Sequence, residues 1–490
     1  MIRAKVITLF FMLMFFSAGL FAQNKDSVQI KTYYSTHELM DINADSSISV
    51  DSSLDLLHEY NPGFTFNQFG VNTGIFGSPY RNVLFELQDK TGFNPGLNSH
   101  NIYLQTTDRV KFFDTYTPYS EIFYVQGGNE LQKLKALHTR NITPFWNVTI
   151  QYSTNNSSQF YGNQTDLLKN KIKNLGFTSS FKSKNGNYKL FASFINNKLF
   201  ASDNGGIDDT AYHNYSLGDK FYANVYLEEV RTEYLEKQLF VKQSLKIAKA
   251  IPDSLRKTQK PGGFFLLHTF QYQKTDVYYH DDDINVNYFK SIYLNNELSD
   301  DSIVYSLWQN EFHLLAQSSK QPLDKFQLGA RHVSARIFQN GHDSAIVYFT
   351  GLVDARKNLL GGQLVLKAEY VLSGSIAKDY SMKFNFKRRI KKTANWFTGA
   401  IFNRNAPAYI MTLARTNHLQ WQNNFNPTIA NSAFTGYENH RFKFKSSLSY
   451  SLISNLIYLN EEVNPLQLNS SLSVIVFQLK KNFKAGYFHF

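Results

Sequence analysis

The chain contains no cysteine, and this absence excludes several kinds of protein. Without cysteine there are no disulfides and no thiolate-bound metal, and the chain is not a lipoprotein anchored through a modified cysteine. Beyond its first 22 residues it also lacks any run of about 18 apolar residues, so no transmembrane helix is expected. It has no glycine-rich phosphate loop, no paired-histidine metal motif and no dinucleotide fingerprint. We therefore expect no cofactor.

The N-terminus has the three parts of a secretory signal peptide. Arg3 and Lys5 supply a positive start, residues 6–16 form an apolar core, and small residues precede a predicted cleavage site after Ala22. A membrane anchor is the alternative, but the apolar core is short for a span of about 20 residues. Removal of residues 1–22 would take away two positive charges and lower the formal charge from +12 to +10.

Aromatic residues are abundant, although the chain as a whole is not hydrophobic. Phe, Tyr and Trp make up 16% of the residues, whereas the mean hydropathy is −0.35. A large soluble core would need more aliphatic residues beside so many aromatics. A membrane β-barrel combines an apolar outer band, two aromatic girdles and a polar lumen. Without a helical span, only a closed barrel satisfies every backbone group in lipid, so the composition favours a barrel.

From about residue 116 onward, apolar and polar residues alternate with a period of two, which gives each strand one apolar and one polar face. The pattern is clear in residues 146–153, 380–387 and 441–452. Asn185-Gly186 lies between two such runs and predicts a hairpin turn. We predict an all-β fold: a transmembrane, antiparallel, up-and-down β-barrel of about 16 strands, give or take two or more, over residues 116–490.

Two segments precede the predicted barrel. Residues 23–59 are polar and rich in Ser and Asp, so we expect a mobile periplasmic leader that buries too little apolar surface to stay ordered. Residues 60–115 mix Gly, Pro, Asn and aromatics, which predicts ordered turns with one or two short strands, forming a hatch or a periplasmic-side cap. Within the barrel, short turns at one end and long loops at the other are expected. The predicted long loops are residues 156–170, 200–220, 278–300 and 405–439.

Few residues suggest chemistry beyond a barrel wall. The acidic run at 280–283, and Asp203 with Asp208 and Asp209, carry oxygen ligands for a hard cation. Neither group has the spacing of a calcium loop. Both are better interpreted as solvated residues at the tips of loops. A barrel lipase would need a serine hydrogen-bonded to a histidine, and no local signature selects one. The candidate histidines are His138, His268, His313 and His332. We expect no metal site, no catalytic residue and no enzyme.

The densest basic cluster covers residues 383–392. Nucleic-acid binding is one interpretation of such a run, but the strand alternation argues against it. Lys383 and Lys387 fall opposite Phe384 and Phe386, and placing these lysines in lipid would cost roughly 2–4 kcal/mol each near the midplane. We therefore expect these lysines to face the lumen, where basic side chains favour the passage of anions. The same alternation selects the candidate pore-lining residues Lys383, Lys387, Arg441, Lys443 and Lys445.

Several short motifs follow one another in an order and spacing typical of one family. They include Gly77-Ser78-Pro79-Tyr80, Thr117-Pro118-Tyr119-Ser120, Tyr124-Val125-Gln126-Gly127-Gly128, Phe160-Tyr161-Gly162-Asn163-Gln164 and Asn204-Gly205-Gly206-Ile207. From about residue 65 to its end the chain thereby resembles the putative-porin family of the Bacteroidota, more strongly before residue 210 than after. The resemblance implies an outer-membrane barrel with a porin-like role, and it brings no catalytic residues.

The C-terminus has features of two kinds of segment. Residues 484–490 resemble the middle of the family's barrels, which suggests a truncated chain. Phe488 and Phe490 nevertheless alternate along the last residues of the chain. Outer-membrane barrels usually end in this way, and the assembly machinery recognises such an end. In a complete chain, we expect residues 483–490 to pair with residues 117–127, whereas in a truncated one that seam would be open.

Three functional hypotheses follow. The first is a channel in the outer membrane of a Gram-negative cell, for passive diffusion of small hydrophilic solutes with a modest anion preference. The second is a non-conducting barrel subunit of a secretion or surface-assembly complex. The third is a carrier for a hydrophobic ligand, with residues 60–115 as a hatch. The expected partners are outer-membrane lipid, the barrel-assembly machinery and small hydrophilic solutes, without nucleic acid. The sequence does not specify the oligomeric state.

Overall fold

The computed structural model describes most of the chain after residue 69 and short pieces before it. The described residues are 31–34, 48–49, 60–62, 70–85, 87, 91–128, 130–158, 169–207, 224–227, 230–249, 262–318, 324–481, 484–485 and 488–489. The predicted signal peptide at 1–22 and most of the predicted leader at 23–59 lie outside these residues.

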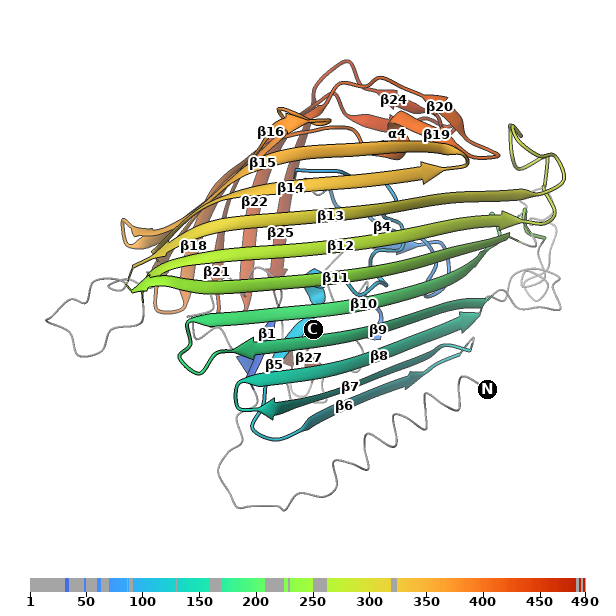
Figure 1. Cartoon of the computed structure of the whole chain (residues 1–490). Coiled ribbons are helices and arrows are strands. Elements are labelled where there is room, and N and C mark those ends of the chain that lie inside the picture. The colour runs from blue at the N-terminus through green and yellow to red at the C-terminus, as the bar shows by residue number, and fades with distance from the viewer. Residues whose placement is uncertain are drawn as a thin grey trace, which may run out of the picture.

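Sixteen antiparallel strands form one curved sheet, in which neighbours in the sheet are also neighbours in the chain (Figure 1). The strands are β6 (Tyr119–Gln126), β7 (Gln132–Thr143), β8 (Trp146–Ser158), β9 (Lys169–Lys182), β10 (Tyr188–Asp203), β11 (Val230–Lys249), β12 (Gly263–Asp281), β13 (Ser299–Gln317), β14 (Lys325–Gln339), β15 (His342–Leu359), β16 (Gly362–Gly374), β17 (Tyr380–Lys391), β18 (Ala394–Asn405), β21 (Thr428–Asn439), β22 (Phe444–Ser454) and β25 (Leu472–Lys481). The predicted all-β, up-and-down antiparallel fold of about 16 strands is confirmed.

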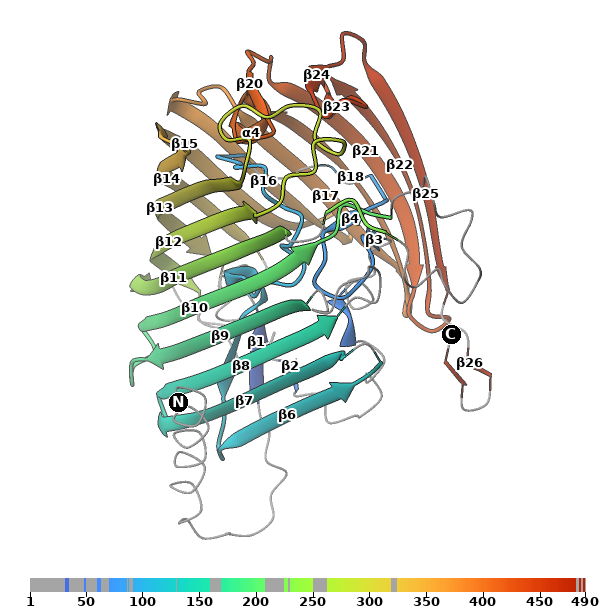
Figure 2. The same cartoon turned by 90° about the vertical axis from the view of Figure 1, so that its right-hand side faces the viewer.

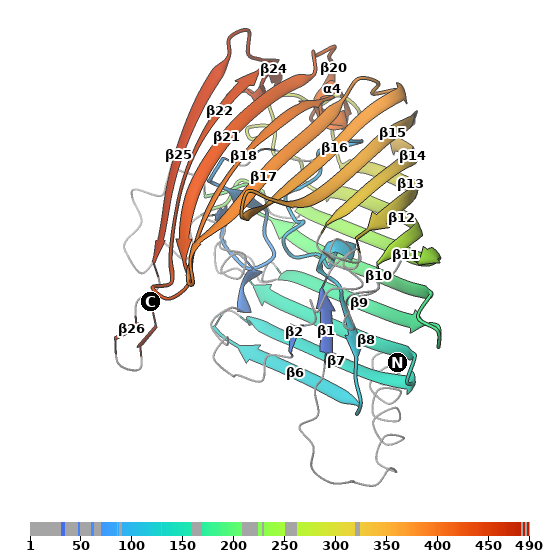
Figure 3. The same ribbon diagram turned by 90° about the vertical axis from the view of Figure 1, so that its left-hand side faces the viewer.

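An interior segment, comprising residues 70–85, 87 and 91–114, lies in the hollow that the sheet curls around (Figures 2 and 3). Its elements are β3 (Gly70–Asn72), β4 (Tyr80–Asn82), the 3-10 turn η3 (Thr107–Arg109) and β5 (Lys111–Asp114). Phe76 and Tyr103 of this segment pack against Leu199 and Tyr234 in one apolar cluster. The strand β1 (Lys31–Tyr34) joins β5 to the short β2 (Ile48–Ser49).

The two faces of the sheet differ as the alternation predicts. On the convex face of β13, Trp308, Phe312 and Leu314 are 49%, 52% and 59% exposed. On the concave face of the same strand, Glu311 and His313 are buried. Because side chains alternate across a strand, the residues between these convex aromatics point into the hollow. The apolar convex face is the surface that a bilayer would cover.

Among the described connections, the longest ones all lie at one end of the sheet, which is called the long-loop end. The short-turn end has the turns at 144–145, 183–187, 360–361, 392–393 and 440–443. The long-loop end has the connections at 282–298, 406–427 and 455–471. These contain α4 (Tyr409–Thr412), β19 (Leu413–Arg415), β20 (Gln420–Gln422), β23 (Ile457–Leu459) and β24 (Pro465–Gln467). In the described part of the chain, no helix is both long and apolar enough to cross a membrane.

Two Asn-Gly turns illustrate how local sequence sets a hairpin. The predicted hairpin between β9 and β10 is present, but its loop spans residues 183–187, and Gly186 has a φ of 70° while Asn185 stays out of the positive region. At the long-loop end, Asn340-Gly341 forms the tighter two-residue turn, with φ angles of 40° and 85°. Positive φ at both central residues is what such a turn requires. The same Asn-Gly signal is present at this second turn, which was not predicted.

The first and last strands of the sheet, β6 and β25, are not paired with each other among the described residues. Residues 484–485 and 488–489, the part of this end that the structure describes, do not make the pairing with residues 117–127 that was expected for a complete chain. Instead, β26 (Lys484–Ala485) pairs with β27 (Phe488–His489) as a separate small hairpin. Figure 2 shows the resulting gap between β6 and β25.

Candidate functional site

Three of the five predicted pore-lining residues lie on the concave face. Lys383 is paired in register with Lys367, and both Lys383 and Lys387 alternate with convex residues such as Phe384, which is 40% exposed. Lys445 lies on the concave face of β22, where it faces Lys480 of β25. A salt bridge joins Lys387 to Glu438 of β21, with 2.5 Å between the nitrogen and oxygen. The strand alternation therefore placed these three side chains on the correct face.

The other two predicted pore-lining residues do not lie on a strand. Arg441 and Lys443 fall in the turn between β21 and β22, and both are exposed. Lys443 has a φ of 48°, which interrupts the extended backbone, and β22 begins only at Phe444. The prediction that they alternate with Phe442 and Phe444 along one strand was wrong, because the apparent period of two continued through a turn. Whether any of the five lines a conducting path stays a prediction.

The concave face has a covered half and an open half. Over β8 to β11, polar residues such as Asn174, Asn197 and Gln238 are buried beneath the interior segment. From β15 to β25, many concave side chains keep contact with solvent, Lys387 and Lys445 among them. The concave charged residues of this open half are Asp354, Arg356, Lys367, Glu369, Lys383, Lys387, Arg389, Glu438, Lys445 and Lys480. Basic residues outnumber acidic ones in this list, so the open half is electropositive.

A network of buried charges joins the interior segment to the wall. Arg331 on β14 contacts Glu311 at 2.6 Å and Glu369 at 3.1 Å, and His313 lies 2.6 Å from Glu311. Thr91 of the interior segment donates a hydrogen bond to Glu369 at 2.9 Å. Breaking one partner of such a buried network leaves an uncompensated charge and is strongly destabilising. The network therefore holds residue 91 against β16.

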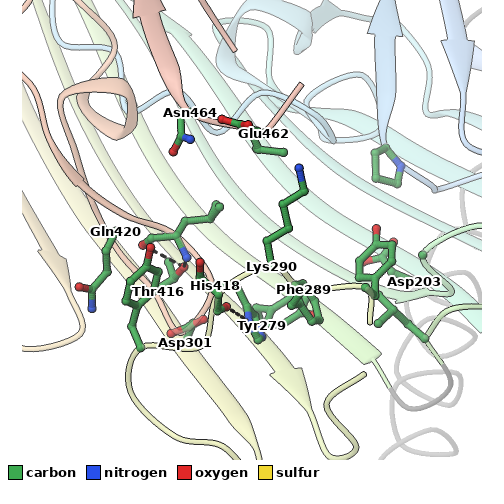
Figure 4. Close-up of a pocket in the computed structure, with 18 of the residues that line it drawn as sticks. Asp203, Tyr279, Phe289, Lys290, Asp301, Thr416, His418, Gln420, Glu462 and Asn464 are labelled. Carbon is green, nitrogen blue, oxygen red and sulfur yellow. Dashed lines mark hydrogen bonds between the residues drawn. The ribbon is translucent and has the colours of Figure 1, made fainter. Parts of the chain in front are cut away.

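A cavity of about 1090 Å³ opens among the long loops (Figure 4). Its wall comes from the ends of β10, β12 and β13, from the connections that follow β10, β12, β18 and β22, and from Thr73 and Pro79 of the interior segment. Its aromatic and charged lining residues are Asp203, Tyr279, Tyr288, Phe289, Lys290, Tyr293, Asp301, His418, Trp421, Glu461 and Glu462. Cavities that combine aromatic walls with a few polar groups are the usual form of a small-molecule site.

The side chains on one side of this cavity are held in place by contacts between distant loops. The His418 ring stacks on Phe289, with 3.5 Å between their centroids. The two ring nitrogens of His418 lie 2.6 Å from the Ser299 hydroxyl and 3.2 Å from the Ser291 carbonyl. Asp301 accepts a hydrogen bond from the backbone N–H of Asn417 at 2.9 Å. Since these contacts join the loop after β12 to the loop after β18, this wall is preformed.

The acidic runs considered as cation sites are engaged in other contacts. Asp282 lies 2.7 Å from His280 and 3.1 Å from Arg231. Asp203 accepts a hydrogen bond from Thr232 at 2.9 Å, whereas Asp208 and Asp209 lie outside the described residues. Among the described residues, no group of three or more His, Asp or Glu side chains is arranged to hold a metal ion.

The four histidines considered for hydrolase chemistry occupy structural positions. His268 stacks on Phe312 and His332 packs against Phe349 with tilted rings, both on the convex face, while His313 belongs to the buried charge network. His138 lies 2.8 Å from the Ser120 hydroxyl. In the described part of the chain, no carboxylate forms an ion pair with His138. A hydrolase triad needs such a group to orient the ring.

The sequence did not predict the cavity. Its lining residues come from segments scattered between residues 73 and 464, and only Asp203 among them had been considered for binding. A signal was nevertheless present. Tyr288, Phe289 and Tyr293 are aromatic residues within a polar segment predicted as a loop. Aromatics in a loop need a surface to pack against, and that need points to an ordered, folded mouth.

A single curved antiparallel sheet with an apolar convex face and a polar concave face defines a β-barrel protein of the outer membrane. A family model described as "Putative porin" matches residues 32–490, so the chain belongs to the putative-porin family and is a protein of the outer membrane. No curated protein sequence matches the chain.

Solved structures with a similar fold are outer-membrane receptors. The siderophore receptor PirA from Acinetobacter baumannii has a TM-score of 0.52 and 9% identity, covering 80% of this chain and 64% of that receptor. The ferric-catecholate import receptor Fiu from Escherichia coli K12 has a TM-score of 0.51 and 9% identity, covering 79% and 65%. The chain thus spans less than two thirds of the length of these receptors. At such identity the likeness shows the fold alone.

Proposed function

We propose that this protein is a channel through which small hydrophilic solutes diffuse across the outer membrane. The observation that carries the proposal is the open half of the concave face, where polar and charged side chains from β15 to β25 stay in contact with solvent. A pore lined by such side chains replaces part of the hydration of a passing solute. The cavity among the long loops is the place where a solute would enter.

Charge on the open half supports a modest preference for anions. Lys367, Lys383, Lys387 and Lys445 lie there, with Glu369 and Glu438 as partial counter-charges. Asp203, Asp301, Glu461 and Glu462 line the mouth and oppose this bias. Exposed charges act over only about 10 Å at 0.1 M salt, so the preference should weaken as salt rises.

Planar-bilayer recording tests the proposal. We expect discrete conductance and a reversal potential that indicates anion selectivity across a KCl gradient. Replacing the four concave lysines Lys367, Lys383, Lys387 and Lys445 by Glu should reverse its sign. A matched variant replaces four exposed lysines of the convex face, Lys171, Lys173, Lys198 and Lys357, by Glu and should keep the wild-type sign.

Three outcomes would contradict the proposal. A cation-selective wild type, or a concave variant that behaves as its convex control, would show that these lysines do not border the conducting path. Complete absence of conductance would instead favour the non-conducting barrel subunit of a secretion or surface-assembly complex.

A second candidate function is a carrier that binds a ligand at the mouth and uses the interior segment as a hatch. Thr73 and Pro79 of that segment contribute to the cavity wall, which favours this candidate. The variant Thr91→Val keeps the buried charge network and removes only the 2.9 Å hydrogen bond from the segment to Glu369 of β16. In a simple channel this change leaves the conductance unchanged. In a carrier whose segment acts as a hatch, it alters the rate of uptake.

A further inference from the structure

Basic residues gather at the short-turn end of the last strands. Residues 386–397, 436–446 and 478–481 contain ten basic side chains and one acidic side chain, Glu438. We call this set the basic rim: Lys387, Arg388, Arg389, Lys391, Lys392, Arg441, Lys443, Lys445, Lys480 and Lys481. In outer-membrane barrels the short turns face the periplasm. The basic rim therefore lies at the level of the inner, phospholipid leaflet of the membrane.

A groove of about 450 Å³ lies at the same end, where β21, β22 and β25 meet. It is lined by Tyr437, Asn439, Phe442, Phe444, Leu479 and Lys481. The register places Phe444 beside Lys481 and Leu479 beside Ser446, on the same face as Phe477. Phe477 is 65% exposed on the convex side. The groove therefore opens toward the bilayer and not toward the hollow of the sheet.

Basic side chains border one end of this groove, and exposed apolar side chains extend from its other end along β25. The Lys481 ammonium lies 5.8 Å from the centre of the Phe442 ring and donates a hydrogen bond to the Phe442 carbonyl at 2.6 Å. The Arg441 guanidinium also lies 5.8 Å from that ring. Toward the middle of the strand, Phe477 and Ile475 are exposed on the convex face. The arrangement is cationic at the rim and apolar along β25.

We propose that this groove binds an anionic phospholipid of the phosphatidylglycerol class. Its phosphate would lie between Arg441 and Lys481, and one acyl chain would run over Leu479, Phe477 and Ile475. Charge complementarity supports an anionic headgroup, because basic side chains near a bilayer surface attract anionic lipids. The apolar continuation supports a lipid and not a free phosphate, which would gain nothing from Phe477 or Ile475. This inference does not depend on whether the barrel conducts.

Native mass spectrometry of the full chain in detergent tests the proposal, with phosphatidylglycerol and phosphatidylcholine of equal chain length as probes. Wild-type protein should retain phosphatidylglycerol in preference to phosphatidylcholine. The double variant Arg441→Gln, Lys481→Gln should bind phosphatidylglycerol at least tenfold more weakly, since each basic side chain near the surface contributes about fivefold. The charge-conserving variant Arg441→Lys, Lys481→Arg should bind it as the wild type does.

A matched control removes two exposed convex lysines from the opposite end of the sheet, in the variant Lys171→Gln, Lys173→Gln. This control should keep wild-type affinity. Equal binding of both lipids by the wild type, or loss of affinity in the control as large as in the rim variant, would overturn the proposal. The proposal would also fail if the wild type bound lipid A more tightly than phosphatidylglycerol and the rim variant lost that lipid A binding. Lipid A belongs to the outer leaflet, and the basic rim lies at the level of the inner one.

Discussion

Asp379 joins the short turn between β16 and β17 to the end of β18 and the loop that follows it. Its carboxylate accepts hydrogen bonds from the backbone N–H of Ala406 at 2.6 Å and from Arg404 at 2.9 Å. Burial nevertheless raises the pKa of Asp379 to about 6, because desolvation of the charged form outweighs the two donors. A carboxyl whose pKa is raised on folding stabilises the folded state most at low pH, and this stabilisation is lost as the pH rises through the folded-state pKa.

We therefore predict that the apparent unfolding temperature in detergent rises as the pH falls from 7.5 to 5. The variant Asp379→Asn should lose part of this dependence, since it no longer takes up a proton. Glu461→Gln, which removes an exposed loop carboxyl, should retain the full dependence. Thermal unfolding followed by circular dichroism at several pH values measures the effect. A wild type whose stability increases with pH in this interval would contradict the prediction.

Among the elements, the interior segment depends on a few polar anchors to the wall. Asn197, fully buried on β10, accepts a hydrogen bond from the N–H of Gln105 and donates one to its carbonyl, at 3.2 Å and 2.8 Å. Gly176 lies beside Gln105, and a Cβ at position 176 would come within 2.9 Å of the Gln105 side-chain amide. A glycine in a strand interior often marks such a close approach of another segment.

Asn197→Leu should loosen the interior segment without unfolding the sheet. The substitution leaves the N–H and C=O of Gln105 without their partner, and each unpaired buried group costs about 1–3 kcal/mol. We expect faster amide hydrogen exchange in residues 101–110 and little change in β13 and β14. The control Asn385→Leu lies on the open half of the concave face and should leave exchange in residues 101–110 unchanged. Equal protection of the amides of residues 101–110 in both variants would show that the hydrogen bonds of Asn197 do not hold the interior segment.

At the scale of the whole molecule, one continuous hydrogen-bonded sheet is embedded in lipid. Val333 lies in the middle of β14, is fully buried, and pairs with Gln309 on one side and Tyr348 on the other. Proline there would remove a ladder donor, and an unsatisfied backbone group in the bilayer costs several kcal/mol. We therefore expect the sheet to tolerate a smaller side chain at this position better than the loss of its backbone N–H.

We predict that the wild type, recovered from the outer-membrane fraction, migrates differently before and after boiling in a detergent gel. Val333→Pro should abolish this heat-modifiable migration, whereas Val333→Ala, which keeps the backbone N–H, should preserve it. Identical migration of boiled and unboiled wild type would argue against a stably folded membrane sheet.

The sequence alone determined the fold class and which residues share a face. With a period of two, the face of each side chain follows from its position in the strand, whatever surrounds the sheet. Lys383, Lys387 and Lys445 were placed correctly for this reason. The same rule failed at Arg441 and Lys443, because periodicity does not mark where a strand ends and a turn begins.

Only the tertiary structure decided what occupies the hollow and what surrounds its mouth. The contact between Gln105 and Asn197, and that between Phe289 and His418, join residues about a hundred positions apart or more. Local propensity carries no information on such pairs, because loops meet through packing and hydrogen bonds that depend on how the whole sheet curls. The cavity and the covered half of the concave face follow from that curl, as does the groove between β21, β22 and β25.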